Sequence, residues 1–180
     1  ETCRMSDIKN YHSEEHSLSN GQVLMRNYSF DEALVIVREM TDNLVLDLFE
    51  KGLVTSSLTL WIAYDHRYEH EASKGTVKLE RESNSSKKII DAVEDLYLRI
   101  ADRYTGIRRI EVCANRVVPE SYVQYSLFDD PKQTDKERHL QEAVLNVKQR
   151  YGKNAIMRGS NLLECSTYRE RNEQIGGHRA

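Results

Sequence analysis

The apolar residues between positions 19 and 118 change their spacing in a fixed order, and this order limits the folds open to the chain. Alternation of apolar and polar residues is the period of a half-buried strand, whereas recurrence every three or four residues is the period of an amphipathic helix. The segments with these periods are a strand at 21–25, a helix from 30 to about 52, strands at 56–64 and 76–81, a helix opened by NSSKK at 84–88, and a strand at 107–118.

The order strand, helix, strand, strand, helix, strand predicts an α+β fold with a ferredoxin-like β-α-β-β-α-β unit. In such a unit two helices pack on one face of a four-stranded sheet, and the other face stays open. Ser29 and Glu32 have the spacing of a capping box at the start of the first helix, and Gly52 is a natural stop at its end. A second capping box, Thr134 with Glu137, predicts a further helix after the unit.

Four segments follow along the chain: a linker at 1–18, the β-α-β-β-α-β unit at 19–118, a connector at 119–133, and a C-terminal helix and tail at 134–180. The sequence starts at a glutamate, so we expect a piece of a longer protein. Three scattered cysteines and the lack of an apolar run of about 20 residues favour a cytoplasmic location without a membrane span.

Charge is divided between the predicted elements, although the formal net charge of −3 excludes a chain that is basic as a whole. The first helix, 30–53, has six acidic residues against two basic ones, whereas 73–88 has five basic against two acidic. The fourth strand adds Arg108 and Arg109 at its start. We therefore expect acid on the helix side and base on the sheet side.

Strand alternation sharpens this expectation, because it sorts side chains between the helix face and the open face. The side chains expected to point outward are Thr59, Trp61, Thr76, Lys78, Arg109 and Glu111. Such a mixture suits contacts with a phosphate backbone and little reading of bases. The alternatives are a solvated face or a face covered by the C-terminal helix.

Lys87 and Lys88 follow a probable N-cap, Ser85 or Ser86, and so lie at the positive end of a helix dipole. This end is unfavourable for cations unless an anion binds there, where free N–H groups and both lysines would face it. We interpret this helix start as an anion site, the alternative being a pair of solvated lysines.

Motifs for catalysis are missing from the sequence, and no catalytic residue is predicted. The chain has no phosphate-binding glycine loop and no nucleophile elbow. The stretches HSEEH (12–16) and HRYEH (66–70) carry histidines, but neither has the H-E-x-x-H order of a metal-binding helix. No metal or cofactor site is therefore expected in this segment.

Several runs together resemble the C-terminal part of Y-family translesion DNA polymerases, in particular the UmuC/DinB-like repair proteins of Gram-positive bacteria. They are SLSNGQVL, SFDEALVIVREMTDNLVLDLFEKGLVT, LTLWIAYD, GTVKLERESNSSKKIIDAVEDLYLRI, IRRIEVCANRVV and the tail RERNEQIGGHRA. The opening ETCRMSDIKNY resembles the exit from the polymerase thumb. The resemblance covers essentially the whole chain.

The resemblance implies that 19–118 is the little finger, which lays its open sheet on the backbones of primer–template DNA. It places DNA contacts at Ser73–Thr76 and at Arg108 and Arg109. The palm, with its magnesium-binding carboxylates, would lie upstream, so this segment needs no cofactor and should be inactive alone. The parent would be an error-prone DNA-directed DNA polymerase of DNA repair and the SOS response.

The connector contains QYSLFDD, in which Leu127 and Phe128 stand side by side although connectors are normally polar. The resemblance implies a Q-x-x-L-F peptide that docks on the bacterial sliding clamp through Gln124, Leu127 and Phe128. Two apolar anchors in a preformed pocket and one directional amide suit such a docking. The alternative is that the Leu–Phe pair staples the connector to the neighbouring helix.

The predicted partners are thus duplex primer–template DNA and the sliding clamp, without a membrane. The candidate DNA-binding residues are Ser73, Lys74, Gly75, Thr76, Lys78, Ser85, Lys87, Lys88, Arg108 and Arg109. Two other functions stay open. An RNA-binding module shares the strand–helix order but exposes two or three aromatics, of which only Trp61 qualifies here. A non-catalytic protein-interaction adaptor would not bind duplex DNA at all.

Overall fold

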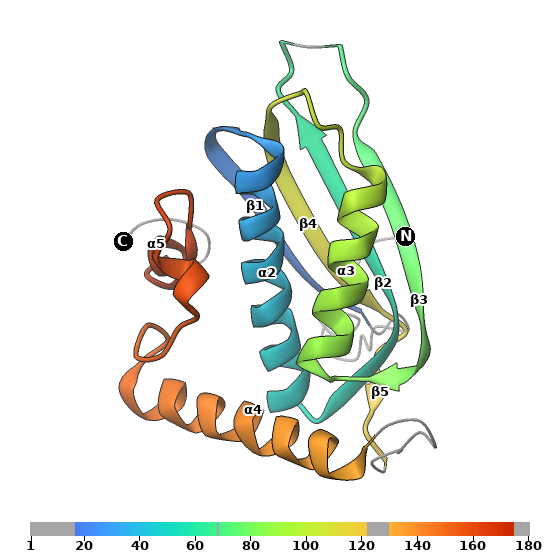
Figure 1. Ribbon diagram of the computed structural model, residues 1–180, viewed down its shortest axis with the longest axis vertical. Helices are drawn as coiled ribbons and strands as arrows, with labels where there is room; N and C mark the ends of the chain where they lie inside the picture. Colours follow the sequence, from blue (N-terminus) through green and yellow to red (C-terminus); the bar gives the residue numbers. More distant parts are fainter. Residues whose placement is uncertain (1–16, 68, 122–129, 175–180) are drawn as a thin grey trace, which may run out of the picture.

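The computed structural model describes residues 17–67, 69–121 and 130–174. Its elements follow the predicted order and then continue into a C-terminal segment (Figure 1). They are β1 (Leu18–Tyr28), α2 (Phe30–Glu50), β2 (Leu53–Tyr64), β3 (Ser73–Ser83), α3 (Ser86–Ile100), β4 (Ile107–Asn115), β5 (Val118–Pro119), α4 (Pro131–Tyr151), the 3₁₀ turn η1 (Gly159–Leu162) and α5 (Tyr168–Asn172).

The four long strands form an antiparallel sheet in the order β1-β4-β2-β3, and α2 and α3 cover one of its faces (Figure 1). The core lies between these two layers. Leu58, Leu60 and Ile62 of β2 are fully buried beneath the helices, as are Ile110 and Val112 of β4. The predicted α+β fold, with two helices on one side of the sheet, is confirmed.

Helix α2 begins as the sequence predicts. The Ser29 side chain accepts a hydrogen bond from the Glu32 N–H, and the Glu32 carboxylate accepts one from the Ser29 N–H. This reciprocal capping box satisfies two N–H groups that the helix leaves without partners. The helix ends at Glu50, and Gly52 turns the chain toward β2 with φ of 61°, a conformation that glycine adopts without strain.

The last predicted strand, 107–118, is divided in the structure. Strand β4 ends at Asn115, and Arg116 has φ of 50°, which breaks the extended chain. The chain then forms the short strand β5, in which Val118 pairs with Val54 at the start of β2. The strand prediction therefore merged two strands that a single left-handed residue separates.

The predicted start of the C-terminal helix is wrong. Helix α4 begins at Pro131, one residue after the N-cap Asp130, whose side chain accepts the Lys132 N–H. Proline suits this first position because its missing N–H would have had no partner. Thr134 donates to the Asp130 carbonyl, and Glu137 is bonded to a different helix.

The segment after α4 packs against the outer side of α2. Glu39, in the middle of α2, is only 2% exposed and accepts hydrogen bonds from the Ser166 hydroxyl and the Thr167 N–H. Arg171 donates to Gln22 of β1 at 3.1 Å, and Tyr168 is buried. These contacts tie the C-terminal segment to the helix layer and to an edge strand.

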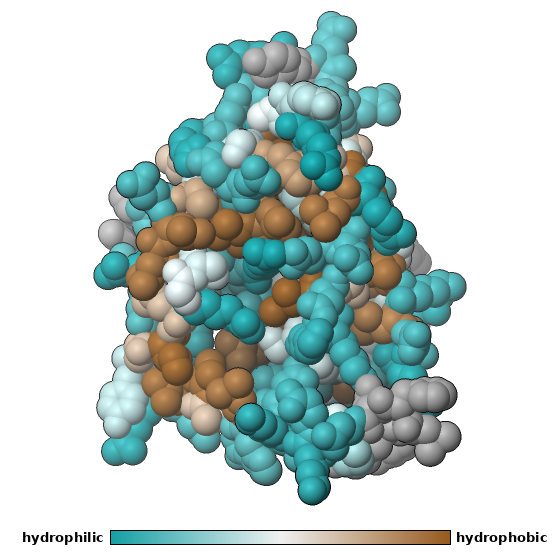
Figure 2. Space-filling model, in the orientation of Figure 1, coloured by the Kyte–Doolittle hydropathy of each residue, from teal (hydrophilic) through white to brown (hydrophobic). Residues whose placement is uncertain are grey.

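The helix side of the molecule is mostly hydrophilic, with hydrophobic groups gathered on the left (Figure 2). In the same orientation, Figure 1 shows the segment after α4 on the left. Large apolar side chains that stay exposed in this part of the chain are Tyr151, Ile156, Leu162 and Leu163. Across the described ranges, no helix is both long and apolar enough to cross a membrane.

Candidate nucleic-acid interface

The face of the sheet opposite the helices carries the basic residues that alternation predicts. Lys74 of β3 is paired across the sheet with Trp61 of β2, and Trp61 is paired on its other side with Glu111 of β4. Lys78 and Thr76 are exposed on the same face of β3, where the Thr76 hydroxyl lies 2.9 Å from that of Thr59. Cations thus lie at intervals along the open face.

The paired arginines lie at a bulge in β4. The register steps from Ala63–Arg109 to Tyr64–Ile107, so Arg108 is an extra residue on β4. Ile107 and Ile110 are both fully buried, although strict alternation would turn them to opposite faces. The bulge lets both isoleucines point into the core and leaves both arginines outside it.

A hollow of about 370 Å³ lies in the open face between β3, β2 and β4. It is lined by Thr59, Trp61, Lys74, Arg109, Glu111, Cys113 and Asn115. The Arg109 guanidinium carbon lies 5.0 Å from the centre of the Trp61 ring, a cation–π contact, and its Nη2 is 3.4 Å from the Glu111 carboxylate. Burial raises the pKa of the Cys113 thiol.

Two of the candidate DNA-binding residues face the helices instead. Ser73 is paired with the inward-facing Ile62, and its hydroxyl lies 2.8 Å from that of Tyr64. A Cβ added to Gly75 would lie 2.8 Å from Leu96 Cδ1, so glycine lets α3 pack closely on the sheet. The side-chain positions of Ser73 and Gly75 thus serve packing, and only their backbone is available to a partner.

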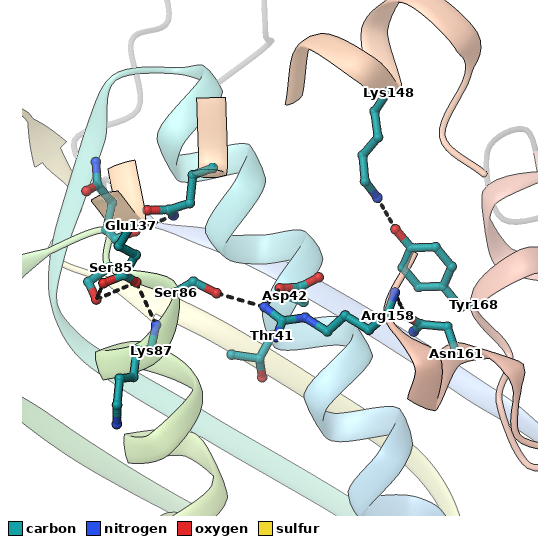
Figure 3. A network of polar contacts seen from close by, with 12 residues as sticks. Thr41, Asp42, Ser85, Ser86, Lys87, Glu137, Lys148, Arg158, Asn161 and Tyr168 are labelled. Carbon is teal, nitrogen blue, oxygen red and sulfur yellow. Dashed lines mark hydrogen bonds and ion pairs between the residues drawn. The ribbon is translucent and has the colours of Figure 1, made fainter. Parts of the chain in front are cut away.

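The start of α3 already holds an anion, which belongs to the protein itself. The Glu137 carboxylate of α4 accepts hydrogen bonds from the Ser85 hydroxyl at 2.9 Å and from the Lys87 N–H at 2.9 Å (Figure 3). The Ser85 side chain also accepts the Lys88 N–H as the N-cap. The anion expected at this helix start is therefore an internal carboxylate, which satisfies the dipole without an external phosphate.

This helix start is also far from the paired arginines in the fold. Helix α3 follows the carboxyl end of β3, whereas Lys74 lies at the beginning of β3, at the same end of the sheet as the amino end of β4. Lys87 pairs with Asp91 one turn along α3. The structure brings Lys74, Thr76, Lys78 and Arg109 to one side of the sheet, with Arg108 at the bulge next to Arg109, and it places Ser85, Lys87 and Lys88 with the helix layer.

A buried carboxylate fixes the chain that leaves β2. Asp65, 3% exposed, accepts hydrogen bonds from the Asn27 amide and from the backbone and guanidinium of Arg67. These donors hold the pKa of Asp65 well below its usual range. Gly106 leaves room for this contact, because a Cβ there would lie 2.9 Å from the Asn27 side chain. The chain at the end of β2 is thereby held in place.

The described C-terminal elements do not cover the open face. Arg158 donates to Asp42 of α2 at 2.6 Å and to Ser86 of α3 at 3.1 Å, and Lys148 contacts the Tyr168 hydroxyl (Figure 3). Gln141 of α4 is buried against the Asn84 carbonyl. Each of these contacts lies on the helix side or at the end of the sheet, so the alternative of a face covered by the C-terminal helix is wrong for the residues described.

The clamp-binding candidates Gln124, Leu127 and Phe128 lie outside the described residues. The chain on either side of them is held in place. Glu120 accepts two hydrogen bonds from the Arg138 guanidinium, at 2.7 and 3.2 Å, and Asp130 caps α4. Within the ranges described, no three His, Cys, Asp or Glu side chains are grouped as metal ligands would be.

Sequence reasoning missed the hollow, whose lining includes Cys113 and Asn115. The alternation that turns Arg109 and Glu111 outward continues to these two positions, so the signal was present in the sequence. What the sequence does not give is the size of the gap, which depends on small side chains from two strands lying side by side.

The unit is a β-α-β-β-α-β domain with an antiparallel sheet in the order β1-β4-β2-β3, whose open face carries cations and a hollow beside Trp61. The impB/mucB/samB family C-terminal domain matches residues 15–127, and the chain belongs to this family. The resemblance found in the sequence is thereby confirmed.

Relatives that match most of this chain are named as DNA polymerases. DNA polymerase IV 2 of Bacillus subtilis (strain 168) is 25% identical over 166 residues, which are 91% of this chain and 39% of the relative. DNA polymerase IV 2 of Halalkalibacterium halodurans is 21% identical over 168 residues, which are 93% of this chain and 40% of the relative. The chain therefore spans well under half of the length of these relatives.

Solved structures that this chain resembles include a complex of beta-clamp processivity factor and little finger domain of PolIV. It has a TM-score of 0.45 and 11% identity, covering 63% of this chain and 100% of that one. The insertion ternary complex of Dbh DNA polymerase has a TM-score of 0.43 and 16% identity, covering 62% of this chain and 33% of that one.

Proposed function

We propose that this chain is the DNA-binding and sliding-clamp-binding C-terminal region of an error-prone translesion DNA polymerase that acts in repair and damage tolerance in the cytoplasm. Membership of the impB/mucB/samB family supports this function. The observation that carries it is the open sheet face with Lys74, Lys78 and the bulged pair Arg108 and Arg109. Polymerisation would need the palm domain and its magnesium, which belong to the rest of the parent protein.

The arrangement of charge suits a phosphate backbone. The cations stand on strands whose side chains are spaced along one face, and the bulge adds a second arginine at the edge of that face. Helix α2, with six acidic residues at 30–50, lies on the opposite side of the sheet. DNA would therefore be attracted to the open face and repelled from the helix side, which orients the domain on the duplex.

Removal of the two arginines tests DNA binding. Arg108→Ala plus Arg109→Ala should weaken duplex binding about equally across sequences and lower the slope of log affinity against log salt by up to about two. Arg150→Ala plus Lys153→Ala is the matched control, because it removes the same charge from the C-terminal segment. The measurement is anisotropy of labelled duplex over a salt series. Equal affinity of the two double variants would refute the assignment of this face.

Clamp binding is proposed for the connector peptide, with Gln124, Leu127 and Phe128 as its contacts. Support comes from the sequence pattern and from the firm anchoring of the connector at both ends, by the Glu120–Arg138 pair and by the Asp130 cap. A tethered peptide gives modest affinity at one site but a high local concentration at the replication fork. DNA binding and clamp binding would then use different surfaces.

The double variant Leu127→Ala plus Phe128→Ala should abolish binding to the bacterial sliding clamp and leave DNA affinity and melting temperature nearly unchanged. Burial of each side chain is worth about 1.5–3 kcal/mol, and a short peptide has few other contacts. Gln124→Ala should have a smaller effect, about 0.5–1.5 kcal/mol. Val123→Ala plus Tyr125→Ala is the control in the same connector. Binding is measured by calorimetric titration with the clamp, and stability by melting curves. If the Leu127/Phe128 variant still binds the clamp, or if its melting temperature falls by several degrees, the pair packs against the fold and does not dock on the clamp.

A further inference from the structure

A carboxylate lies in the middle of the face that is proposed to meet phosphate. Glu111 stands between Trp61 of β2 and Gly21 of β1, with 37% of its side chain exposed. Its single described ion pair is the 3.4 Å contact with Arg109. A carboxylate repels a phosphate, but it accepts hydrogen bonds from the amino group of a base such as cytosine. Glu111 is therefore better suited to the edge of a base than to a backbone.

The hollow next to Glu111 is large enough for a small ligand. Its volume of about 370 Å³ lies within the roughly 300–1,000 Å³ of ligand pockets. The space exists because Thr59 and Cys113, the neighbours of Trp61 on this face, have short side chains. The lining offers polar groups, since the Asn115 amide donates to the Thr59 hydroxyl at 2.8 Å.

Trp61 supplies the aromatic surface of the hollow. Trp61 is half-buried, and the Arg109 guanidinium carbon lies 5.0 Å from the centre of its ring. Aromatic rings with adjacent arginines are the usual platforms for stacking of unpaired bases, whereas bases paired inside a duplex cannot reach such a ring. Lys74 and Arg109 at the mouth would contact the phosphates on either side of the base.

We propose that the hollow lined by Trp61, Glu111 and Asn115 binds a single unpaired nucleobase of DNA, stacked on Trp61 with its amino edge toward Glu111. The inference rests on the DNA binding proposed above and deepens it, because it names DNA with an unpaired base as the preferred substrate. The base comes from a bulge in a duplex or from a single strand. A fully paired duplex would use the cations of the face and leave the hollow empty.

Trp61 is the one tryptophan in the sequence, so its fluorescence reports directly on the hollow. The full 180-residue chain is titrated with three DNAs of one sequence: a paired duplex, the same duplex with one extra cytosine, and the single strand. The bulged duplex and the single strand should quench Trp61, and the paired duplex should not. Anisotropy should show the bulged duplex bound roughly 5- to 150-fold more tightly than the paired one, as expected for one base–aromatic stack.

Variants separate stacking from edge recognition. Trp61→Ala should abolish the preference for the bulge while keeping the affinity for paired duplex, and Trp61→Phe should keep part of the preference. Glu111→Gln should reduce the preference for an extra cytosine over an extra thymine, which lacks the amino group. Met25→Ala, which truncates an exposed apolar side chain of β1 outside the hollow, is the control and should bind as the unmodified chain does.

The outcomes distinguish the two levels of the proposal. Binding of paired and bulged duplex with equal affinity, without quenching of Trp61, would overturn the base site and leave the DNA-binding function standing. Failure to bind any of the three DNAs would overturn the DNA-binding function itself. Tighter binding of the RNA strand of the same sequence would overturn the assignment to DNA.

Discussion

Glu137 is the residue whose removal tests most directly how α4 is held on the rest of the domain. Its carboxylate accepts the Ser85 hydroxyl and the Lys87 N–H, and so adds a second cap to the start of α3 (Figure 3). Glu137→Ala removes both contacts. Ser85 still accepts the Lys88 N–H, so one cap remains. We expect a loss of about 1–2 kcal/mol in the free energy of unfolding, the usual range for a lost cap or a hydrogen bond to a charged group.

The loss corresponds to a fall of roughly 2–8 °C in melting temperature for a chain of this size. Thermal unfolding followed by circular dichroism measures it, beside urea titrations. Glu142→Ala is the matched control, because it removes an exposed carboxylate from the same helix. If the two variants have the same stability, the contact between Glu137 and α3 contributes nothing measurable and the docking argument is wrong.

Three further outcomes follow from the same structure. Asp65→Asn should lower the free energy of unfolding at pH 7, measured by urea titration. The difference in stability from the unmodified chain should shrink progressively as the pH falls below about 4, because the pKa of Asp65 is lowered in the folded chain and its stabilisation is lost as the pH falls toward that pKa. Gly75→Ala should cost about 1–3 kcal/mol in a urea titration, because the new Cβ would crowd Leu96. Lys87→Ala plus Lys88→Ala should leave duplex affinity, measured by anisotropy, nearly unchanged, contrary to the expectation from the sequence.

Local motifs were predictable from the sequence where both partners are near each other in the chain. Ser29 and Glu32 form the predicted capping box, and the Arg26 guanidinium binds the same Glu32 carboxylate without displacing it from the cap. Thr134 and Glu137 have the same spacing, but the Glu137 carboxylate instead accepts a hydrogen bond from the Ser85 hydroxyl, 52 residues away. Spacing alone gives no information on such a distant partner, and the predicted helix start was therefore wrong.

The open face was predicted more fully than the details of its site. Strand alternation placed Lys78 and Arg109 outward, since the period of a strand is fixed by its backbone. It could not assign Arg108, which depends on the bulge, although two apolar residues three apart, Ile107 and Ile110, were a signal of it. The same alternation turns Gly75 inward, whereas the family resemblance had placed a DNA contact there.

The C-terminal segment also sets an order of events in folding. Glu39 accepts hydrogen bonds from Ser166 and Thr167, which are 127 and 128 residues away in the sequence. Gln22 accepts one from Arg171, which is 149 residues away. The core cluster lies almost entirely between Leu24 and Val117, so the sheet and its two helices can close before the ribosome has released the last residues. Contacts of such long range close late and open early. The amide of Thr167 should therefore exchange its hydrogen with solvent sooner than the amides of β2 and β4.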